Sequence, residues 1–351
     1  MMPELAVQSK PASICVLRLS AIGDTCHALA VIRRLQDNWP DAKITWIIGK
    51  TEARLMAGIA DIDFVVFDKS LGRKAYKAVA LQLAGRHYDV ALCMHASLRA
   101  NLLCRRIPAA IRLGFDRSRA RDFQWLFTNR RVPAALGEHA LEAMMSFATA
   151  IGAETRDLRW DIPLSDSERE FPRQFLEADR TLVVVSPCSS QRSRNYRNWP
   201  VENYAATIDY LQNNYNCAVV LTGGNSETDR QYGDALAPTG AIDLMGKTSL
   251  KELLALIRAA RLVICPDSGP AHMATTVDTP VIALFATSNP DRTGPYLSRS
   301  LAVNRYPDAV RKYLNREVEA LRWGQRVRNP DAMSLITIDD VRSKIDEFFA
   351  S

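Results

Sequence analysis

The feature that most constrains the fold is an alternation of short apolar runs with longer stretches of helical spacing, found in both halves of the chain. In the first half, helical spacing covers 29–36 and 75–83. The apolar runs around these stretches predict strands over 14–17, 44–48, 64–67, 90–94 and 109–113. Such βαβ units produce parallel strands with helices on both faces of the sheet. The first half therefore predicts an α/β domain with a parallel sheet.

The second half restarts this pattern after a polar, proline-punctuated segment over 161–169, which predicts a linker. The pattern then predicts strands over 182–186, 218–222, 241–244, 262–265 and 281–285, and helices over 200–212, 250–259 and 271–276. An amphipathic stretch that begins at Thr337 predicts a capped closing helix. We expect two Rossmann-like domains, 1–165 and 166–336, and a C-terminal helix over 337–351. Ligands of such sheets bind beyond the carboxyl ends of the strands, here in a central cleft.

The cysteines and the apolar runs indicate a cytosolic protein. The seven cysteines are an odd number, lack CxxC spacing and mostly lie inside apolar runs, as reduced core residues do. The first dozen residues lack the features of a secretory signal, and no apolar run approaches the roughly 18 residues of a membrane span.

The charge distribution favours an anionic partner. The formal net charge is +6, and arginines concentrate between Arg99 and Arg131 and again between Arg311 and Arg328. A solvated surface explains such runs in the simplest way. The alternative is recognition of phosphate or carboxylate groups, which the guanidinium fork suits. RNA is a weaker candidate because the chain carries no RNA-binding motif.

Three polar turns that follow predicted strands are candidate sites. In Cys-Pro-Asp-Ser-Gly-Pro-Ala-His-Met, which starts at residue 265, Ser268 is a good helix N-cap, and the free N–H groups beside Gly269 would face a phosphate. In the loop over 187–200, Ser189 and Ser190 can donate to phosphate oxygens, and Arg197 can offset the charge of a diphosphate. Glu227 follows a glycine-rich turn and can accept ribose hydroxyls. Each turn also has a plain structural explanation, as an ordinary cap, a solvated loop or a helix-starting acid.

The loop after the first predicted strand carries the candidate catalytic residue. Asp24 lies in Ser-Ala-Ile-Gly-Asp, just before a helical run, so it is either a general base or a first-turn acid stabilised by the helix dipole. The GxGxxG and GxxxxGK[ST] spacings are missing, which argues against a dinucleotide dehydrogenase and a P-loop NTPase. The histidines lack HxxxH and HxH pairing, and no GxSxG elbow is present, so zinc and serine-hydrolase chemistry are not supported.

Taken in order, these loops resemble glycosyltransferase family 9, the lipopolysaccharide heptosyltransferases. The most specific elements are Asp-Ser-Gly-Pro-Ala-His from residue 267 and Pro-Asp-Arg-Thr-Gly-Pro-Tyr from residue 290. The resemblance implies a GT-B fold and an inverting transfer of heptose from ADP-L-glycero-D-manno-heptose to the Kdo or Kdo-phosphate region of the lipopolysaccharide inner core. It also implies that the reaction needs no cofactor and no metal.

The resemblance assigns a role to each candidate residue. Asp24 falls on the catalytic base, and Arg197 falls where the family usually has a lysine on the donor diphosphate. The donor-binding residues that it implies are Ser189, Ser190, Arg197, Glu227, Thr248, Asp267, Ser268, Gly269 and His272. The acceptor-binding residues that we expect from it are Arg73, Lys74, Arg119 and Arg121. The loop over 191–196 is longer than in the best-known members, which affects the assignment of the two serines.

The implied partners are ADP-heptose, an acceptor of the Kdo-lipid A type and the inner face of the inner membrane, which a cytoplasmic enzyme would contact peripherally. No nucleic acid is expected, and the oligomeric state stays open. The arginine-rich first half favours addition of the first heptose. The alternatives are addition of a later heptose by a type II or III enzyme, a sugar-nucleotide epimerase of similar fold, and a nucleotide-binding module without catalysis.

Overall fold

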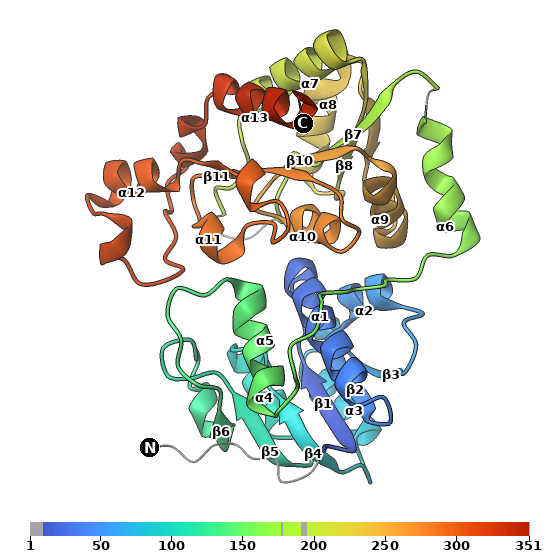
Figure 1. The fold of residues 1–351 in the computed structure, drawn as a ribbon, viewed down its shortest axis with the longest axis vertical. Helices are drawn as coiled ribbons and strands as arrows, with labels where there is room; N and C mark the ends of the chain where they lie inside the picture. The colour runs from blue at the N-terminus through green and yellow to red at the C-terminus, as the bar shows by residue number, and fades with distance from the viewer. Residues whose placement is uncertain (1–9, 177, 191–194, 351) are drawn as a thin grey trace. The chain divides into compact units, whose positions relative to one another are not determined.

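The computed structural model describes residues 10–176, 178–190 and 195–350. Residues 1–9, which belong to the N-terminal stretch without secretory-signal features, lie outside the described residues. Residues 191–194 of the loop over 191–196 also lie outside them. The chain divides into two compact units, the first ending at Pro163 and the second beginning at Leu164 (Figure 1). Each unit is an α/β structure built on one parallel sheet, which confirms the predicted fold class.

The first unit contains a six-stranded sheet in the order β3-β2-β1-β4-β5-β6, with every neighbouring pair parallel. Its strands are β1 (Ser13–Leu17), β2 (Lys43–Gly49), β3 (Ile62–Phe67), β4 (Tyr88–Leu92), β5 (Ala109–Gly114) and β6 (Arg130–Arg131). Five of them follow the apolar runs of the sequence. The two-residue β6 is too short to show any periodicity, so sequence patterns could not predict it.

The helices of the first unit are α1 (Ile22–Asn38), α2 (Lys50–Met56), α3 (Arg73–Gln82), α4 (Leu98–Cys104) and α5 (Ala140–Ala150). Helix α1 is buried over most of its length because it packs against both the sheet and α5 (Figure 1). It starts at Ile22, earlier than the predicted stretch over 29–36. The early start places the polar loop that precedes it at the carboxyl end of β1.

The second unit has the strand order β12-β11-β10-β7-β8-β9, again with every neighbouring pair parallel. Its strands are β7 (Thr181–Val185), β8 (Cys217–Gly223), β9 (Ile242–Met245), β10 (Leu262–Pro266), β11 (Val281–Phe285) and β12 (Val303–Asn304). Its helices are α6 (Asp166–Glu170), α7 (Val201–Tyr215), α8 (Glu227–Leu236), α9 (Leu250–Ala259), α10 (Gly269–Thr275), α11 (Pro290–Thr293), α12 (Tyr306–Leu314) and α13 (Ile338–Ala350). The central strands β7, β10 and β11 are almost entirely buried, as their continuous apolar runs require.

The closing helix α13 packs against α7 in the second unit (Figure 1). Thr337 Oγ1 accepts from the Asp340 N–H at 3.1 Å, as expected of the capping threonine. The hydroxyls of Tyr210 and Tyr215 on α7 donate to Asp346 on α13, at 2.7 and 2.6 Å. These contacts fix the last helix to the unit that contains β7 to β12.

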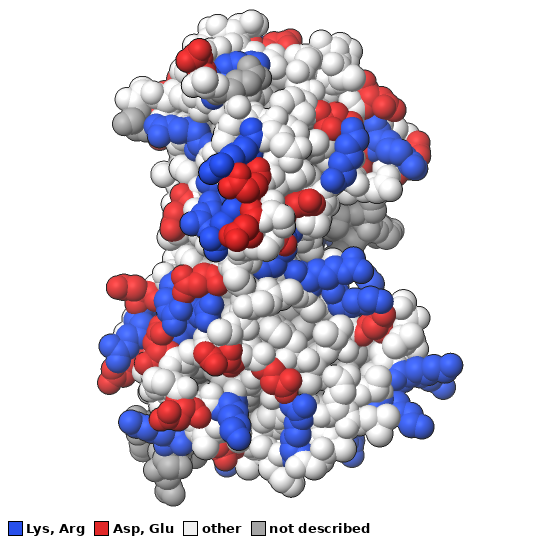
Figure 2. Space-filling view, turned by 90° about the vertical axis from the view of Figure 1, so that its right-hand side faces the viewer, with Lys and Arg blue, Asp and Glu red and all other residues white. Residues whose placement is uncertain are grey.

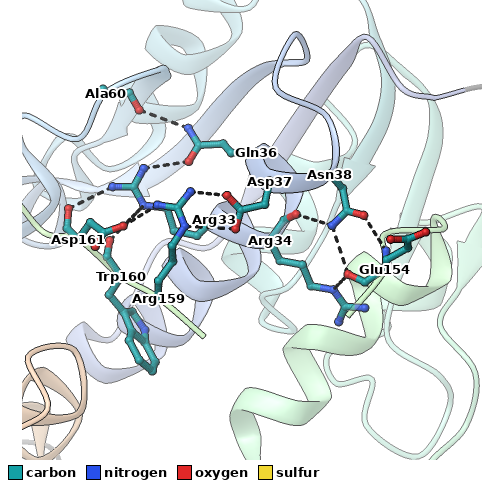
Figure 3. Close-up of polar contacts among 10 residues, drawn as sticks. All are labelled: Arg33, Arg34, Gln36, Asp37, Asn38, Ala60, Glu154, Arg159, Trp160 and Asp161. Carbon is teal, nitrogen blue, oxygen red and sulfur yellow. Dashed lines mark hydrogen bonds and ion pairs between the residues drawn. The ribbon is translucent and has the colours of Figure 1, made fainter. Parts of the chain in front are cut away.

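Two arginines of α1 hold the final segment of the first unit, residues 153–161 (Figure 3). Arg33 donates to the carbonyls of Trp160 and Asp161, both at 3.1 Å. Arg34 donates to the carbonyls of Ala153 and Glu154, at 2.6 and 2.7 Å. Since residues 153–161 form no helix or strand, the guanidinium groups supply hydrogen bonds that regular secondary structure would otherwise provide to these carbonyls.

We expect Arg34→Met to lower the free energy of unfolding of the first unit by about 1–3 kcal/mol, because it leaves the buried Ala153 carbonyl without its donor, whereas the Glu154 carbonyl keeps Asn38 Nδ2. Methionine keeps the apolar stem of the side chain, so the loss reports the hydrogen bonds. Urea unfolding measures the effect. Arg156→Met is the matched control, since Arg156 is exposed and pairs with the exposed side chain of Glu154. The stability of this variant should change by less than about 0.5 kcal/mol. Equal losses in both variants would contradict the role of Arg34.

The cysteines are buried free thiols, as the sequence predicted. Burial raises the pKa of Cys188 and of Cys265 to about 12, so both stay protonated at neutral pH and are poor nucleophiles. In the part of the chain that the structure describes, no helix combines the length and the apolar character that crossing a bilayer requires.

Candidate functional site

The predicted donor-binding residues all follow strands of the second sheet, in the spatial order β10-β7-β8-β9. Asp267, Ser268, Gly269 and His272 follow β10; Ser189, Ser190 and Arg197 follow β7; Glu227 follows β8; Thr248 follows β9. Because all these strands are parallel, the nine residues lie at the end of the sheet that the carboxyl ends of the strands form. This is the end at which open parallel sheets bind ligands.

A buried ion pair joins two of these loops at the centre of this end. Arg197 Nη1 donates to the Asp267 carbonyl at 2.7 Å and lies 3.1 Å from Asp267 Oδ2. Arg197 Nε donates to Asn195 Oδ1 at 2.6 Å. The side chains of Arg197 and Asp267 are only 11% and 7% exposed, so the pair is shielded from solvent. The guanidinium is therefore held in one orientation at the carboxyl ends of β7 and β10.

Asp267 is kept ionised by several partners. Burial on its own would raise the pKa of this carboxyl, but the charges of Arg197 and His272 and the hydroxyl of Ser288 together lower the pKa below its usual value. Ser288 Oγ donates to Asp267 Oδ2 at 2.7 Å and comes from the loop after β11. Ser288 was not predicted from the sequence, since a single serine after a strand carries no distinctive signal.

We expect the acid sensitivity of the second unit to depend on Asp267. Its pKa is lower in the folded state, so its ionised form contributes stability above the unfolded pKa of about 4, and this contribution is lost as pH falls through the folded value. In the Asp267→Asn variant, the fall in melting temperature between pH 6 and pH 3 should be smaller than in the wild type. At pH 7 the variant should be less stable than the wild type, because Arg197 is then buried without its counter-charge. Asp166→Asn, at an exposed carboxyl, should keep the wild-type pH dependence. A wild-type acid profile in the Asp267 variant would contradict this assignment.

The turn into α10 differs in one respect from the sequence-based expectation. Ser268 occupies the N-cap position, but its hydroxyl accepts no cap hydrogen bond. The hydroxyl oxygen is buried and forms no hydrogen bond with a nitrogen or oxygen atom of the described residues, and its polar neighbour is the Cys265 thiol. A buried hydroxyl without such a partner is costly, about 1–3 kcal/mol, so this atom is suited to bind an incoming polar group. Gly269 and Pro270 form the first turn of α10, as predicted.

Two asparagines that the sequence analysis missed organise the loop after β7. Asn198 Oδ1 accepts from both the backbone N–H and the hydroxyl of Ser189, each at 2.8 Å. Asn195 Nδ2 donates to Ser189 Oγ at 2.9 Å and to the Ser190 carbonyl at 2.6 Å. A recess of about 220 Å³ is lined by Ser189, Ser190, Asn195, Tyr196, Asn198, Thr228 and Pro330. Pockets for whole small ligands usually measure about 300–1,000 Å³, so this recess is sized for part of a ligand.

The turns after β8 and β9 lie against each other through a hydrogen bond from the Gly246 N–H to the Gly223 carbonyl, at 3.1 Å. Glu227 begins α8, pairs with Arg230 at 2.9 Å and is 72% exposed, so it is open to a ligand. Asp229, which was not predicted, folds the turn by accepting from the N–H groups of Gly224 and Ser226 at 3.1 and 3.0 Å. Thr248 is half-buried in the neighbouring turn.

Asp24 belongs to the first unit, where it is the third residue of α1. Its carboxylate accepts from the Ala21 N–H at 3.2 Å and forms an ion pair with Arg18. Arg18 is in turn fixed by donating to the Met94 carbonyl at 2.6 Å. The Asp24 side chain is 37% exposed, so it has the helix-capping role and still presents its carboxylate to solvent.

The four predicted acceptor-binding residues have different surroundings. Arg73 and Lys74 are exposed at the start of α3, and Arg121 is exposed in the segment between β5 and β6. Arg119 forms ion pairs with Asp116 and Glu138 and donates to the Pro133 carbonyl at 2.6 Å. Its role within the unit is therefore to hold these loops together, and its charge is already balanced.

Two further features of the described residues concern ligand binding: the distribution of surface charge and the placement of side chains that could bind a metal ion. On the face drawn in Figure 2, many Lys and Arg side chains lie beside Asp or Glu side chains, as on an ordinary solvated surface. Over residues 10–176, 178–190 and 195–350, no three His, Cys, Asp or Glu side chains are grouped so that they could hold a metal ion.

Comparison with known proteins identifies the family of the chain and solved structures with the same fold. The profile of Glycosyltransferase family 9 (heptosyltransferase) matches residues 76–318. The chain is 36% identical to the lipopolysaccharide core heptosyltransferase OpsX of Haemophilus influenzae, over 94% of this chain and 95% of that protein. The structure of the E. coli heptosyltransferase WaaC with ADP has a TM-score of 0.72 at 18% identity, covering 96% of this chain and 99% of that one. WaaC with ADP-2-deoxy-2-fluoro heptose has a TM-score of 0.69 at 18% identity, covering 95% and 99%.

Proposed function

Because this chain belongs to glycosyltransferase family 9, we propose that it transfers L-glycero-D-manno-heptose from the ADP-linked sugar to the inner core of lipopolysaccharide. The Haemophilus influenzae relative, named as a lipopolysaccharide core enzyme, supports this acceptor class. The ADP-heptose analogue bound by the E. coli neighbour supports the donor. The observation that carries the proposal is the buried Arg197–Asp267 pair, next to the Ser268 hydroxyl that accepts no cap hydrogen bond, where the strands of this parallel sheet end.

Arg197 has a hydrogen-bond donor available for the diphosphate. The contacts of the described residues engage its Nε and Nη1, which leaves Nη2 for a ligand oxygen. As the bond between the anomeric carbon and the phosphate oxygen breaks, its electron pair goes to ADP. The guanidinium and the N–H groups at Ser268 and Gly269 would stabilise that charge, in place of a divalent cation. The leaving group then needs no proton, so the reaction requires neither metal nor acid catalyst.

Asp24 is the proposed general base. A sugar hydroxyl is a weak nucleophile at neutral pH, and a nearby carboxylate assists by taking its proton as the bond to the anomeric carbon forms. Attack from the face opposite the departing ADP inverts the anomeric configuration. In this scheme the first unit supplies the base and binds the acceptor, and the second unit binds ADP-heptose.

The acceptor that we propose is the Kdo or Kdo-phosphate region of a Kdo-lipid A molecule, and the heptose added is the first. Exposed cations of the first unit, Arg73, Lys74 and Arg121, suit a carboxylated or phosphorylated sugar. Since lipid A anchors the acceptor, the enzyme works in the cytoplasm at the inner face of the inner membrane.

Incubating the purified protein with ADP-heptose and a panel of truncated core acceptors tests the proposal. We expect a heptosylated product from Kdo-terminated acceptors, with the same rate in the presence of a chelator. A product only from heptose-terminated acceptors would indicate a later heptose. Consumption of ADP-heptose without acceptor would indicate an epimerase, and tight ADP binding without turnover would indicate a non-catalytic module.

A further inference from the structure

The first unit exposes five large apolar side chains from two neighbouring segments. Leu98 and Leu102 lie one helical turn apart on α4, and Phe123, Trp125 and Leu126 lie in or next to the short 3₁₀ helix Gln124–Leu126. Each of the five is between 43% and 66% exposed. We call these five residues the apolar patch. Scattered single exposed leucines need no explanation, whereas adjacent exposed aromatic and aliphatic side chains mark an interaction surface.

Hydrogen bonds hold the two segments of the patch together. The Leu98 N–H donates to Asp122 Oδ2 at 2.9 Å, and Asn101 Nδ2 donates to the carbonyls of Arg121 and Asp122 at 3.2 and 2.8 Å. Asn101 is buried, so this junction is part of the protein interior. The start of α4 and the segment that carries Phe123 are therefore neighbours in space.

The local structure turns the apolar side chains outward. Gln124 is buried, donates to the Cys93 carbonyl at 2.8 Å and accepts from the Phe115 N–H at 3.1 Å. Its apolar neighbours Phe123, Trp125 and Leu126 are left outside, the reverse of the usual partition. Asp122 and Phe123 both have positive φ values, 51° and 57°, which a bulky residue such as phenylalanine rarely adopts. Backbone of this kind persists only where the surrounding structure fixes it, and it occurs most often at functional sites.

The surroundings of the patch are strongly basic. Residues 96–131 contain nine arginines and two acidic residues, Asp116 and Asp122. Both aspartates are engaged internally, Asp116 by Ser118 and Arg119 and Asp122 by the start of α4. Arg105 and Arg106 follow Leu98 and Leu102 at helical spacing and are exposed, as are Arg99 and Arg121. Apolar and cationic side chains are thus combined on one surface.

We propose that the apolar patch, with its flanking arginines, docks the protein on an anionic phospholipid bilayer. Tryptophan, phenylalanine and leucine enter the boundary between headgroups and acyl chains, and arginines bind the phosphates of the headgroups. A second copy of this chain is a poor occupant, because a symmetric contact would place these arginines against one another. The proposal rests on the lipid-anchored acceptor of the proposed function, and it assigns the surface that brings the enzyme to that acceptor.

Sedimentation of the full-length protein with lipid vesicles tests the proposal. We expect binding to vesicles of phosphatidylcholine mixed with phosphatidylglycerol, little binding to phosphatidylcholine alone, and release at high salt. Trp125→Ser should weaken binding to the mixed vesicles about tenfold or more, and Arg105→Gln about fivefold. Leu176→Ser is the matched control, because Leu176 is exposed to the same degree as Trp125 but belongs to the other compact unit, and its binding should equal that of the wild type.

Activity assays separate this proposal from the proposed function. Trp125→Ser should transfer heptose to a deacylated, water-soluble acceptor at the wild-type rate, and should be slower only with acceptor embedded in vesicles. If the wild type transfers to neither acceptor, the proposed function fails, while the vesicle measurement still decides the docking surface. Unchanged vesicle binding in Trp125→Ser would overturn the proposal, as would a wild-type dimer that this substitution dissociates.

Discussion

Asp24→Ala is expected to lower the rate of heptose transfer by about 10²- to 10⁴-fold, the contribution of a positioned general base. The affinity for ADP should stay within about twofold of the wild type, because the donor-binding residues belong to the other sheet. Asp24 also caps α1 through the Ala21 N–H, so the alanine variant should lose about 1 kcal/mol of stability. Turnover under saturating donor and acceptor, with ADP titration by calorimetry, measures both effects.

Two further variants separate catalysis from capping at position 24. Asp24→Asn keeps an oxygen that can accept from the Ala21 N–H but cannot take a proton, so it should be as inactive as the alanine variant and more stable. Glu142 has the equivalent position on α5, where it accepts from the His139 N–H at 2.9 Å. Glu142→Ala should therefore lose stability but keep its transfer rate. Near-normal turnover in Asp24→Asn would remove Asp24 from the role of base.

Arg197→Ala is expected to raise the donor KM and to lower kcat by about 10²- to 10³-fold, the usual loss when one donor to a developing anion is removed. The variant should also be about 3–5 kcal/mol less stable, because Asp267 is then buried without its counter-charge. Arg197→Lys restores the charge but lacks the fork that reaches Asn195 and Asp267 together, so it should recover only part of the loss. Steady-state kinetics and thermal unfolding measure these effects.

Arg180 provides the comparison for Arg197. It precedes β7, at the opposite end of the same sheet, and donates to the Cys217 carbonyl at 2.5 Å. Arg180→Ala should lower the melting temperature and leave the donor kinetics unchanged. If Arg197→Ala shows the same pattern, with lower stability and normal donor kinetics, its proposed contact with the diphosphate is wrong.

The candidate site was only partly visible in the sequence. Ser189, Asp267 and Ser268 were found because small polar residues directly follow apolar runs, a local signal. Asn195, Asn198 and Ser288 were missed, although they form hydrogen bonds with Ser189 and Asp267, because a single polar residue in a loop has no pattern. Asp229, which folds the turn before Glu227, was missed for the same reason. The cap expected at Ser268 shows the same limit, since its geometry depends on the packing around α10 and not on the residue type.

By itself, the sequence determined the class of the protein. Continuous apolar runs predict central parallel strands, and their order along the chain predicts two α/β units, because burial on both faces of a sheet leaves a local periodicity. Which charged side chains form ion pairs over long sequence separations became clear only from the tertiary structure. Arg197 and Asp267 are 70 residues apart and pair across two strands, and Arg119 pairs with Glu138, 19 residues further along the chain. The tertiary structure also decided that Gln124 is buried while Phe123 and Trp125 face solvent. Ion pairs and buried hydrogen bonds join residues that only the folded chain brings within about 4 Å, so no local pattern encodes them.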